Sequence, residues 1–329
     1  MTAIAIVGMG WWGRTIAAQA RESALLDPVL AVEPDPAARA NAEGAGLRVA
    51  DRFEAALEDP RVEAVVLCSP HRFHAEQIAA AAQAGRHVFC EKPLCTTRAE
   101  VETALAAVER AGVVLGIGHE RRFEPAIIEL RERFARGAFG AILNIEGNFS
   151  QDKFLALPRD NWRFSPEEAP AGPLSATGIH LVDLSIALLG RPHEVWARLA
   201  TRGSDFANGD TLSITLGFAN GASATLTALL ATPFIGRFAV FGAEGWTEIR
   251  DRAHPETPAG WDMLEMLRGG QPTSRFFAPH PVVRANLEAF AQAVRGIAPY
   301  PVTHDEMRAN VASFEAIIRS TASGGIERV

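Results

Sequence analysis

A short apolar run leads directly into three closely spaced glycines near the start of the chain. Residues 3–7 are followed by Gly8-x-Gly10-x-x-Gly13, and helix-forming residues continue from 15 to 24. A short apolar run of this kind is typical of a buried parallel strand, so the pattern predicts a strand, a glycine turn and a helix. In that setting Gly8 permits the tight turn, Gly10 lets a pyrophosphate approach the backbone, and Gly13 lets the helix pack closely. The N–H groups and dipole of the helix N-terminus then attract the phosphates.

A second apolar run supplies the other half of a dinucleotide site. Residues 29–32 precede Glu33, which follows Gly13 by 20 positions. A ribose-binding acid stands at about this distance in dinucleotide-binding folds. The alternative is a glycine turn in another kind of α/β protein, with Glu33 solvated at a strand end. A carboxylate at this position accepts both ribose hydroxyls of NAD and repels the extra phosphate of NADP, so the sequence favours NAD.

Composition narrows the class of protein. The chain has 329 residues, enough for two domains, and with a net charge of −7 nothing suggests the basic face that a nucleic-acid-binding protein needs. No apolar run reaches the roughly 18 residues of a membrane span, and no basic segment precedes the first apolar run as in a signal peptide. Cys68, Cys90 and Cys95 form no C-x-x-C pair. We therefore expect reduced thiols in a cytoplasmic protein.

Strands and helices alternate along residues 1–122. Further strands are expected near residues 47–50, 64–68, 87–90 and 113–117, and Thr97 with Glu100 forms a capping box for the helix that follows. This alternation predicts a doubly wound parallel sheet, a Rossmann domain that binds a dinucleotide. Ligands of such sheets bind at the carboxyl ends of the strands, where residues 69–74 and 91–93 also lie.

Lys92 is the candidate for chemistry at this edge. It follows a strand and precedes Pro93, which limits its freedom. Beside a cationic nicotinamide ring and partly buried, we expect its pKa to fall, which suits proton transfer or the stabilisation of a developing alkoxide. The alternative is a surface lysine in a turn.

The pattern changes over residues 123–329. A charged helix is expected over 125–136, followed by strands near 141–149, 194–200, 211–218, 222–230 and 237–241 and by helices near 281–295 and 305–320. Asn220-Gly221 indicates a hairpin, so the sheet should be large, open and mostly antiparallel. Residues 253–280 are rich in proline and glycine and are expected to form a mobile loop. The expected helices can cover only one face of this sheet, so the other face should mediate a homodimer or homotetramer.

These motifs resemble the oxidoreductase family grouped with glucose–fructose oxidoreductase and inositol 2-dehydrogenase. The markers are Gly8-Met9-Gly10-Trp11-Trp12-Gly13, Ser69-Pro70-His71-Arg72-Phe73-His74, Glu91-Lys92-Pro93 and Gly118-His119-Glu120-Arg121-Arg122-Phe123-Glu124-Pro125. The resemblance implies a Rossmann domain followed by an α+β domain that binds substrate and mediates oligomerisation. It also implies that Lys92 touches both nicotinamide and substrate. Cofactor contacts implied in the same way come from Trp11, Trp12, Ser69, Pro70, His74 and Glu91.

A second motif lies in the second half. Asn161-Trp162-Arg163-Phe164 precedes Gly172-Pro173-Leu174-Ser175-Ala176-Thr177-Gly178-Ile179-His180-Leu181-Val182-Asp183, which resembles the family's substrate-domain motif. The resemblance implies cofactor contacts from Trp162 and Arg163, substrate contacts from Arg163, His180 and Asp183, and catalysis by His180. Histidine is the natural base near neutral pH, and Asp183 shares its face if the segment is helical. The alternative for His180 is a satisfied core histidine.

One departure from the family concerns the substrate. The family's aspartate is Ala176 here, which puts ordinary sugar or cyclitol oxidation in doubt. Arg121, Arg122, Lys153, Arg159 and Arg163 suggest a substrate carboxylate if several face the pocket. The alternative is that most of them are solvated or bind the cofactor.

The leading hypothesis is an NAD-dependent dehydrogenase or reductase acting on a secondary alcohol or ketone of a sugar, cyclitol or related polyhydroxy or acidic molecule. The rival is a non-catalytic nucleotide-binding sensor on the same fold. His71 and His74 stand three apart, but no third ligand of matching geometry accompanies them, so we expect no metal. The sequence identifies neither the substrate nor the reaction direction.

Overall fold

The computed structural model describes residues 1–329 and divides into two compact units. Unit 1 comprises residues 1–120 and 282–307, and unit 2 comprises residues 121–281 and 308–329. The expected division at residue 122 treated the chain as two successive segments, whereas residues 282–307 return to unit 1. The amphipathic pattern of that helix does not say which core it covers.

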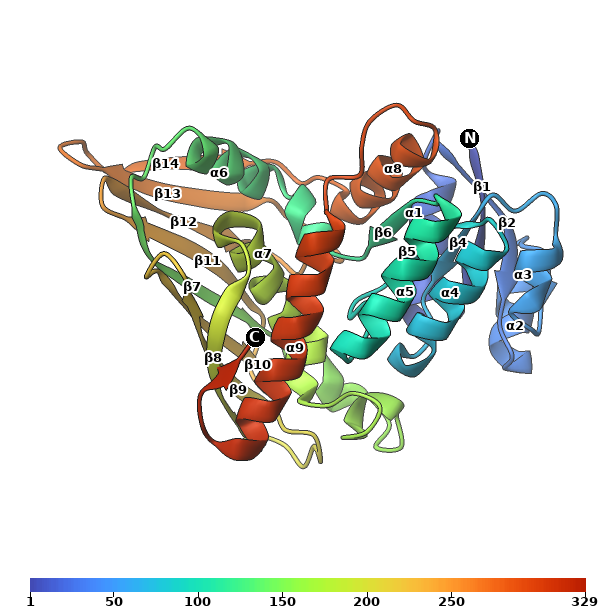
Figure 1. Ribbon diagram of the computed structural model, residues 1–329. Helices are drawn as coiled ribbons and strands as arrows, with labels where there is room; N and C mark the ends of the chain where they lie inside the picture. Colours follow the sequence, from blue (N-terminus) through green and yellow to red (C-terminus); the bar gives the residue numbers. More distant parts are fainter. The chain divides into compact units, whose positions relative to one another are not determined.

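Unit 1 is built on a parallel sheet of six strands, in the order of a dinucleotide-binding fold (Figure 1). In sheet order the strands are β3 (Val49–Ala50), β2 (Leu26–Val32), β1 (Thr2–Val7), β4 (Ala64–Leu67), β5 (His87–Cys90) and β6 (Leu115–Ile117). The helices are α1 (Trp11–Arg21), α2 (Pro36–Gly44), α3 (Glu54–Glu58), α4 (His74–Gln83), α5 (Arg98–Ala111) and α8 (Val282–Val294). The expected doubly wound parallel sheet is thus confirmed.

Local sequence signals account for these elements. The side chains of β4 are all buried, as expected for a central strand that pairs in parallel with β1 and β5. Thr97 and Glu100 form the expected capping box at the start of α5, and Gly112 ends that helix in the left-handed conformation.

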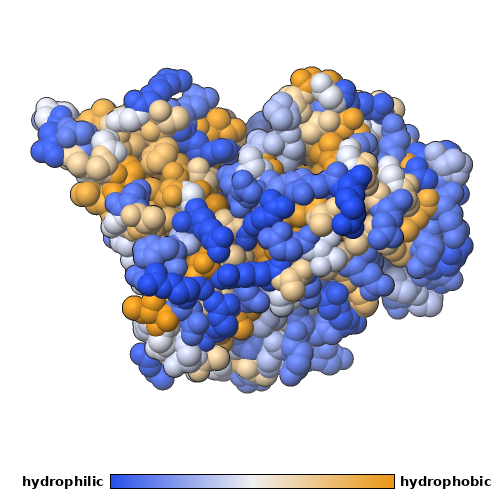
Figure 2. Space-filling model, in the orientation of Figure 1, coloured by the Kyte–Doolittle hydropathy of each residue, from blue (hydrophilic) through white to orange (hydrophobic).

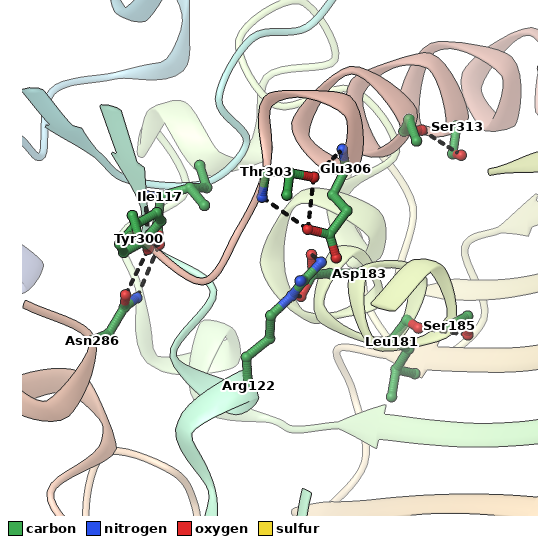
Figure 3. Close-up of polar contacts among 11 residues, drawn as sticks. Ile117, Arg122, Leu181, Asp183, Ser185, Asn286, Tyr300, Thr303, Glu306 and Ser313 are labelled. Atoms are coloured by element: carbon green, nitrogen blue, oxygen red, sulfur yellow. Dashed lines mark hydrogen bonds and ion pairs between the residues drawn. The ribbon is translucent and has the colours of Figure 1, made fainter. Parts of the chain in front are cut away.

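Helix α8 covers the end of this sheet although it comes late in the chain. The ring of Phe290 packs edge-on against Phe89 of β5, with ring centroids 5.6 Å apart. Asn286 Nδ2 donates to the carbonyl of Ile117 (2.9 Å), and the hydroxyl of Tyr300 accepts from the Ile117 N–H (3.1 Å) (Figure 3). These contacts satisfy backbone groups of the edge strand β6 and explain why residues 282–307 belong to unit 1.

Unit 2 is built on a sheet of nine strands in which only β7 and β10 pair in parallel (Figure 1). In sheet order the strands are β14 (Thr273–Phe277), β13 (Trp261–Leu267), β12 (Gly245–Asp251), β11 (Ile235–Gly242), β7 (Ile142–Ser150), β10 (Ser223–Leu229), β9 (Thr211–Phe218), β8 (Pro192–Ala200) and β15 (Glu327–Arg328). The helices are α6 (Pro125–Ala135), α7 (Ile179–Leu189) and most of α9 (His304–Ser323). The expected open, mostly antiparallel sheet is confirmed.

The expected mobile loop over residues 253–280 is wrong. Strands β13 and β14 occupy residues 261–267 and 273–277 of it, and β12, which the sequence did not predict, pairs with β13 along its whole length. Prolines and glycines lie on both sides of β13, at residues 255, 258 and 260 before it and at residues 269, 270, 272 and 279 after it. Within β13, Trp261 and Met263 bury their side chains and alternate with less buried residues, a period-2 pattern that the composition obscured.

The outward face of the sheet is mixed rather than uniformly apolar. Trp196, Leu264 and Met266 are exposed, while Arg237 forms ion pairs with Glu146 and Glu248 near the middle of the sheet. Figure 2 views the opposite side of the sheet, which carries α6, and shows apolar side chains among polar ones over α6 and strands β12–β14. No helix of the protein has the length and apolar character needed to cross a membrane.

Candidate active site

The glycine turn after β1 is shaped by close backbone contacts. Gly8 has φ +89°, and a Cβ on it would lie 2.8 Å from the backbone carbonyl of Cys68. A Cβ on Gly13 would lie 1.9 Å from the carbonyl oxygen of Gly8. Only glycine fits at either position, so strand, turn and helix pack as a dinucleotide fingerprint requires.

Gly10 has a different environment. It is the N-cap of α1, no side chain caps this helix end, and a Cβ built on Gly10 meets nothing within 4 Å. The first turn of a helix presents N–H groups that lack intrahelical acceptors. The open space and these donors fit a pyrophosphate, which supports a dinucleotide at this turn.

Glu33 directly follows β2, and hydrogen bonds to backbone N–H groups hold its carboxylate beside the glycine turn. Its Oε2 accepts from the Met9 N–H (2.7 Å) and its Oε1 from the Asp35 N–H (2.9 Å). Each carboxylate oxygen keeps a further lone pair for a hydroxyl donor. Arg39 donates to the backbone carbonyls of Glu33 and Pro34, at 2.8 and 3.1 Å.

His74 joins the loops that follow β4 and β5. Its ring is fully buried, with Nδ1 2.8 Å from the carbonyl oxygen of Pro93 and Nε2 2.9 Å from that of Ser69. Burial lowers the pKa of this imidazole. The ring therefore lies beneath the two loops and contacts backbone, whereas the resemblance implied that it lines the cofactor.

Glu91 and Lys92 extend the same edge of the sheet. Burial raises the pKa of the Glu91 carboxyl, although a hydrogen bond with Trp12 and the charge of Lys92 oppose the shift. The Lys92 N–H donates to Glu91 Oε2 at 3.3 Å, and the Lys92–Pro93 peptide bond is cis. The side chain of Lys92 is half-buried, as are those of Ser69 and Pro70 in the loop after β4.

In unit 2, Trp162 and Arg163 lie on a short 3-10 turn, η4 (Trp162–Phe164). The Arg163 guanidinium lies 4.4 Å from the centroid of the Trp162 ring, and burial lowers its pKa. Asn208 Nδ2 donates to the carbonyls of Arg163 and Ala169, both at 2.7 Å. No carboxylate pairs with Arg163, so this cation suits an anionic or polar ligand group.

His180 and Asp183 occupy the first two turns of α7. Both side chains are buried, with 3% and 2% exposure. Arg122 binds both Asp183 oxygens, from Nε to Oδ2 and from Nη2 to Oδ1, each at 2.7 Å (Figure 3). This bidentate pair holds α7 in place. The contacts give no support to the expectation that Asp183 binds substrate.

Arg121 is likewise neutralised inside the protein. Its guanidinium contacts Glu124 and Asp251, both at 2.7 Å, and lies 4.9 Å from the centroid of the Phe149 ring. Burial opposes the charged form of Arg121, but the two carboxylates outweigh it and raise the pKa. Neither Arg121 nor Arg122 is solvated or available to a substrate carboxylate.

The turn before α7 carries two features that the sequence did not reveal. Residues Leu174–Gly178 form one turn of π-helix, η5, a rare conformation that recurs at functional sites. Ala171 has φ +48°, unusual for a residue other than glycine. Ala176, where the resemblance implies an aspartate, packs against the apolar cluster of Phe164, Phe206 and Leu230.

Comparison with known proteins identifies the family. Residues 2–119 match the model of an oxidoreductase family with an NAD-binding Rossmann fold, and residues 127–248 match the GFO/IDH/MocA C-terminal domain. The chain belongs to the Gfo/Idh/MocA oxidoreductase family. Its expected family membership is therefore confirmed, and the protein is an NAD(P)-dependent dehydrogenase or reductase. The sensor alternative finds no support.

Individual relatives agree with this assignment. The chain is 29% identical over 274 residues to a D-xylose 1-dehydrogenase (NADP(+)) of Haloferax volcanii, covering 83% of this chain and 82% of that enzyme. An aldose-aldose oxidoreductase from Caulobacter crescentus, solved with glycerol, aligns with a TM-score of 0.87 at 27% identity over 100% and 99% of the two chains. Levoglucosan dehydrogenase, solved with NADH and levoglucosan, shares the fold with a TM-score of 0.85 at 23% identity over 100% and 99%.

Two aromatic side chains, Phe149 beside His180 and His254 on the same phenyl ring, were missed by sequence reasoning. The Phe149 ring lies 5.8 Å from the His180 ring and 5.9 Å from that of His254, measured between centroids. No local motif marks Phe149 or His254, because their significance depends on contacts between distant segments. The structure contains no group of three or more histidine, cysteine, aspartate or glutamate side chains arranged to hold a metal ion.

Proposed function

We propose that this oxidoreductase uses NAD and acts on a secondary alcohol, or the corresponding ketone, of a sugar, cyclitol or related polyhydroxy molecule. The observation that carries the proposal is the uncapped glycine turn with the braced Glu33 carboxylate beside it. The names of the relatives, which include xylose and levoglucosan dehydrogenases, support a polyhydroxy substrate.

The proposal assigns the cofactor contacts to both units. In unit 1 they come from the Gly8–Gly13 turn, including Trp11 and Trp12, and from Glu33, Ser69, Pro70, Glu91 and Lys92. In unit 2 they come from Trp162 and Arg163. Bound nicotinamide supplies the hydride chemistry at its C4 atom.

Two side chains carry the proton chemistry in this proposal. In the oxidative direction His180 accepts the hydroxyl proton of the substrate, since histidine is the base whose ordinary pKa lies near neutrality. Lys92 stabilises the negative charge that develops on the same oxygen. The Asp183–Arg122 pair holds the helix of His180, which makes Asp183 a positioning residue rather than a substrate ligand.

Glu33 should give NAD the advantage over NADP. Its carboxylate is fixed by two backbone N–H groups, so it cannot turn away from a 2′-phosphate without losing both hydrogen bonds. We expect the wild type to bind NAD more tightly than NADP, and Glu33→Ser to reduce the difference between the two affinities. Titration of both cofactors into both proteins, monitored by tryptophan fluorescence, measures these affinities. Tighter NADP binding by the wild type would refute it.

The substrate class is tested by absorbance at 340 nm. The wild-type protein with NAD should oxidise at least one member of a panel containing D-xylose, myo-inositol and D-glucose. NAD binding without turnover of any polyol, cyclitol or sugar acid would favour the sensor instead.

The same proposal makes the protein a cytoplasmic homodimer or homotetramer. All three cysteines are free, which suits a reducing compartment. The open face of the nine-stranded sheet exposes Trp196, Leu264 and Met266, which suits a contact with a second copy.

A further inference from the structure

Three polar side chains from distant segments meet beyond the ends of β7 and β12. Lys153 forms an ion pair with Glu256, and its Nζ lies 3.4 Å from Nδ1 of His254. The N–H of Glu256 donates to the same Nδ1 at 3.3 Å. The side chains of Lys153, His254 and Glu256 are 37%, 18% and 22% exposed. These three residues form the Lys153 cluster.

The Lys153 cluster is linked to His180 by one aromatic ring. Phe149, near the end of β7, contacts the imidazoles of both His180 and His254, with centroid distances of 5.8 and 5.9 Å. The ring of Phe234, the residue before β11, completes the group, with its centroid 5.4 Å from that of His254 and 6.3 Å from that of Phe149. Because both imidazoles contact the same phenyl ring, their centroids are at most 11.7 Å apart.

We propose that the Lys153 cluster is a substrate-recognition group, which binds hydroxyls of a neutral polyhydroxy substrate away from the carbon that reacts. This inference rests on the proposed function, because it takes His180 as the group that acts on the reacting hydroxyl. The Glu256 carboxylate accepts from substrate hydroxyls, and the Lys153 ammonium donates to them. Nδ1 of His254 lies within hydrogen-bond distance of the Lys153 ammonium and the Glu256 N–H, and in this proposal its Nε2 contacts a substrate hydroxyl.

The charges of this region select a neutral substrate over a sugar acid. Lys153 is compensated by Glu256, so a substrate carboxylate would have to displace that partner. Arg121 and Arg122 are compensated by the buried carboxylates of Asp251, Glu124 and Asp183. Arg121 and Arg122, two of the arginines that the sequence suggested as carboxylate ligands, thus add no uncompensated charge near His180.

Substitution of the cluster tests the inference through the specificity of the reaction. His254→Ala, Lys153→Met and Glu256→Gln should each lower kcat/KM for D-xylose or myo-inositol by about 10- to 100-fold, mostly through KM. Their NAD affinity should stay that of the wild type. Glu256→Gln should also shift the kcat/KM ratio toward D-gluconate, because it leaves Lys153 uncompensated. Lys153→Arg, which keeps the positive charge that Lys153→Met removes, should retain most of the activity with neutral substrates.

A matched control and a binding measurement separate this inference from the proposed function. His193→Ala removes a histidine of the same unit that is 41% exposed beside Glu194, and its kinetics should match the wild type. Calorimetric titration of NADH-loaded protein with the same compounds reports binding without turnover. Binding that is lost in the cluster variants supports the inference even if the wild type shows no turnover.

Two results would overturn the inference. If the wild type turns over polyols and the cluster variants behave like His193→Ala, the inference fails and the proposed function stands. If the wild type neither binds nor oxidises any of these compounds, both fail.

Discussion

At the scale of single residues, three glycines of one turn have different physical tasks. Gly13→Ala places a Cβ into the carbonyl oxygen of Gly8, so we expect a loss of about 2–3 kcal/mol or more in unfolding free energy. Gly10→Ala meets no protein atom and should change stability by less than about 1 kcal/mol, yet it fills the space of the pyrophosphate. We therefore expect NAD affinity to fall at least about tenfold, equivalent to 1.4 kcal/mol. Urea unfolding and NAD titration measure the two effects.

The control for this pair is Gly44→Ala, at the end of α2, where a Cβ also meets nothing within 4 Å. It should bind NAD as the wild type does. Unchanged NAD binding by Gly10→Ala would contradict the assignment of this turn to the cofactor.

At the scale of elements, the pair Arg122–Asp183 ties the short turn η2 (Glu120–Phe123) to α7. Because both groups are buried, Arg122→Met leaves an uncompensated carboxylate and should cost about 3–5 kcal/mol of unfolding free energy. Adding Asp183→Leu should recover much of that loss, since the double variant buries no charge. Urea unfolding of the single and double variants tests this. An equal loss of unfolding free energy in the single and double variants would show that the pair contributes through shape alone.

The control for this cycle is Arg52→Ala, which removes one partner of a surface pair with Glu58. It should leave the unfolding curve almost unchanged, because exposed pairs contribute little.

Elements were predicted correctly where a short stretch of sequence contains the whole pattern that specifies them. The strands of unit 1 are continuous apolar runs bounded by turn residues, and the capping box of Thr97 lies within four positions, so short windows located them. Strands β12–β14 were missed because prolines and glycines nearby outweighed the alternation at Trp261. The motifs nominated Lys92 and His180, but the Lys153–His254 contact joins residues 101 positions apart. No window of sequence contains such a contact.

At the scale of the whole molecule, the open sheet face of unit 2 is the surface proposed for self-association. Light scattering at micromolar concentration should show a dimer or tetramer, and Leu264→Arg should shift it toward monomer because a charge would be buried in the contact. Ile297→Arg changes an exposed apolar residue outside the sheet and should leave the assembly intact. A monomeric wild type would refute the proposed assembly.

The central claim is that Lys92 and His180 carry the proton chemistry of an NAD-dependent oxidoreductase. The direct test is NADH formation at 340 nm by the wild type, Lys92→Ala, His180→Ala and the double variant. In each single variant kcat should fall by a factor of about 10² to 10⁴, while the NAD affinity stays that of the wild type. The double variant should lose less than the product of the two, because groups that act on one oxygen are not additive. Turnover at the wild-type rate in Lys92→Ala and His180→Ala would contradict the account.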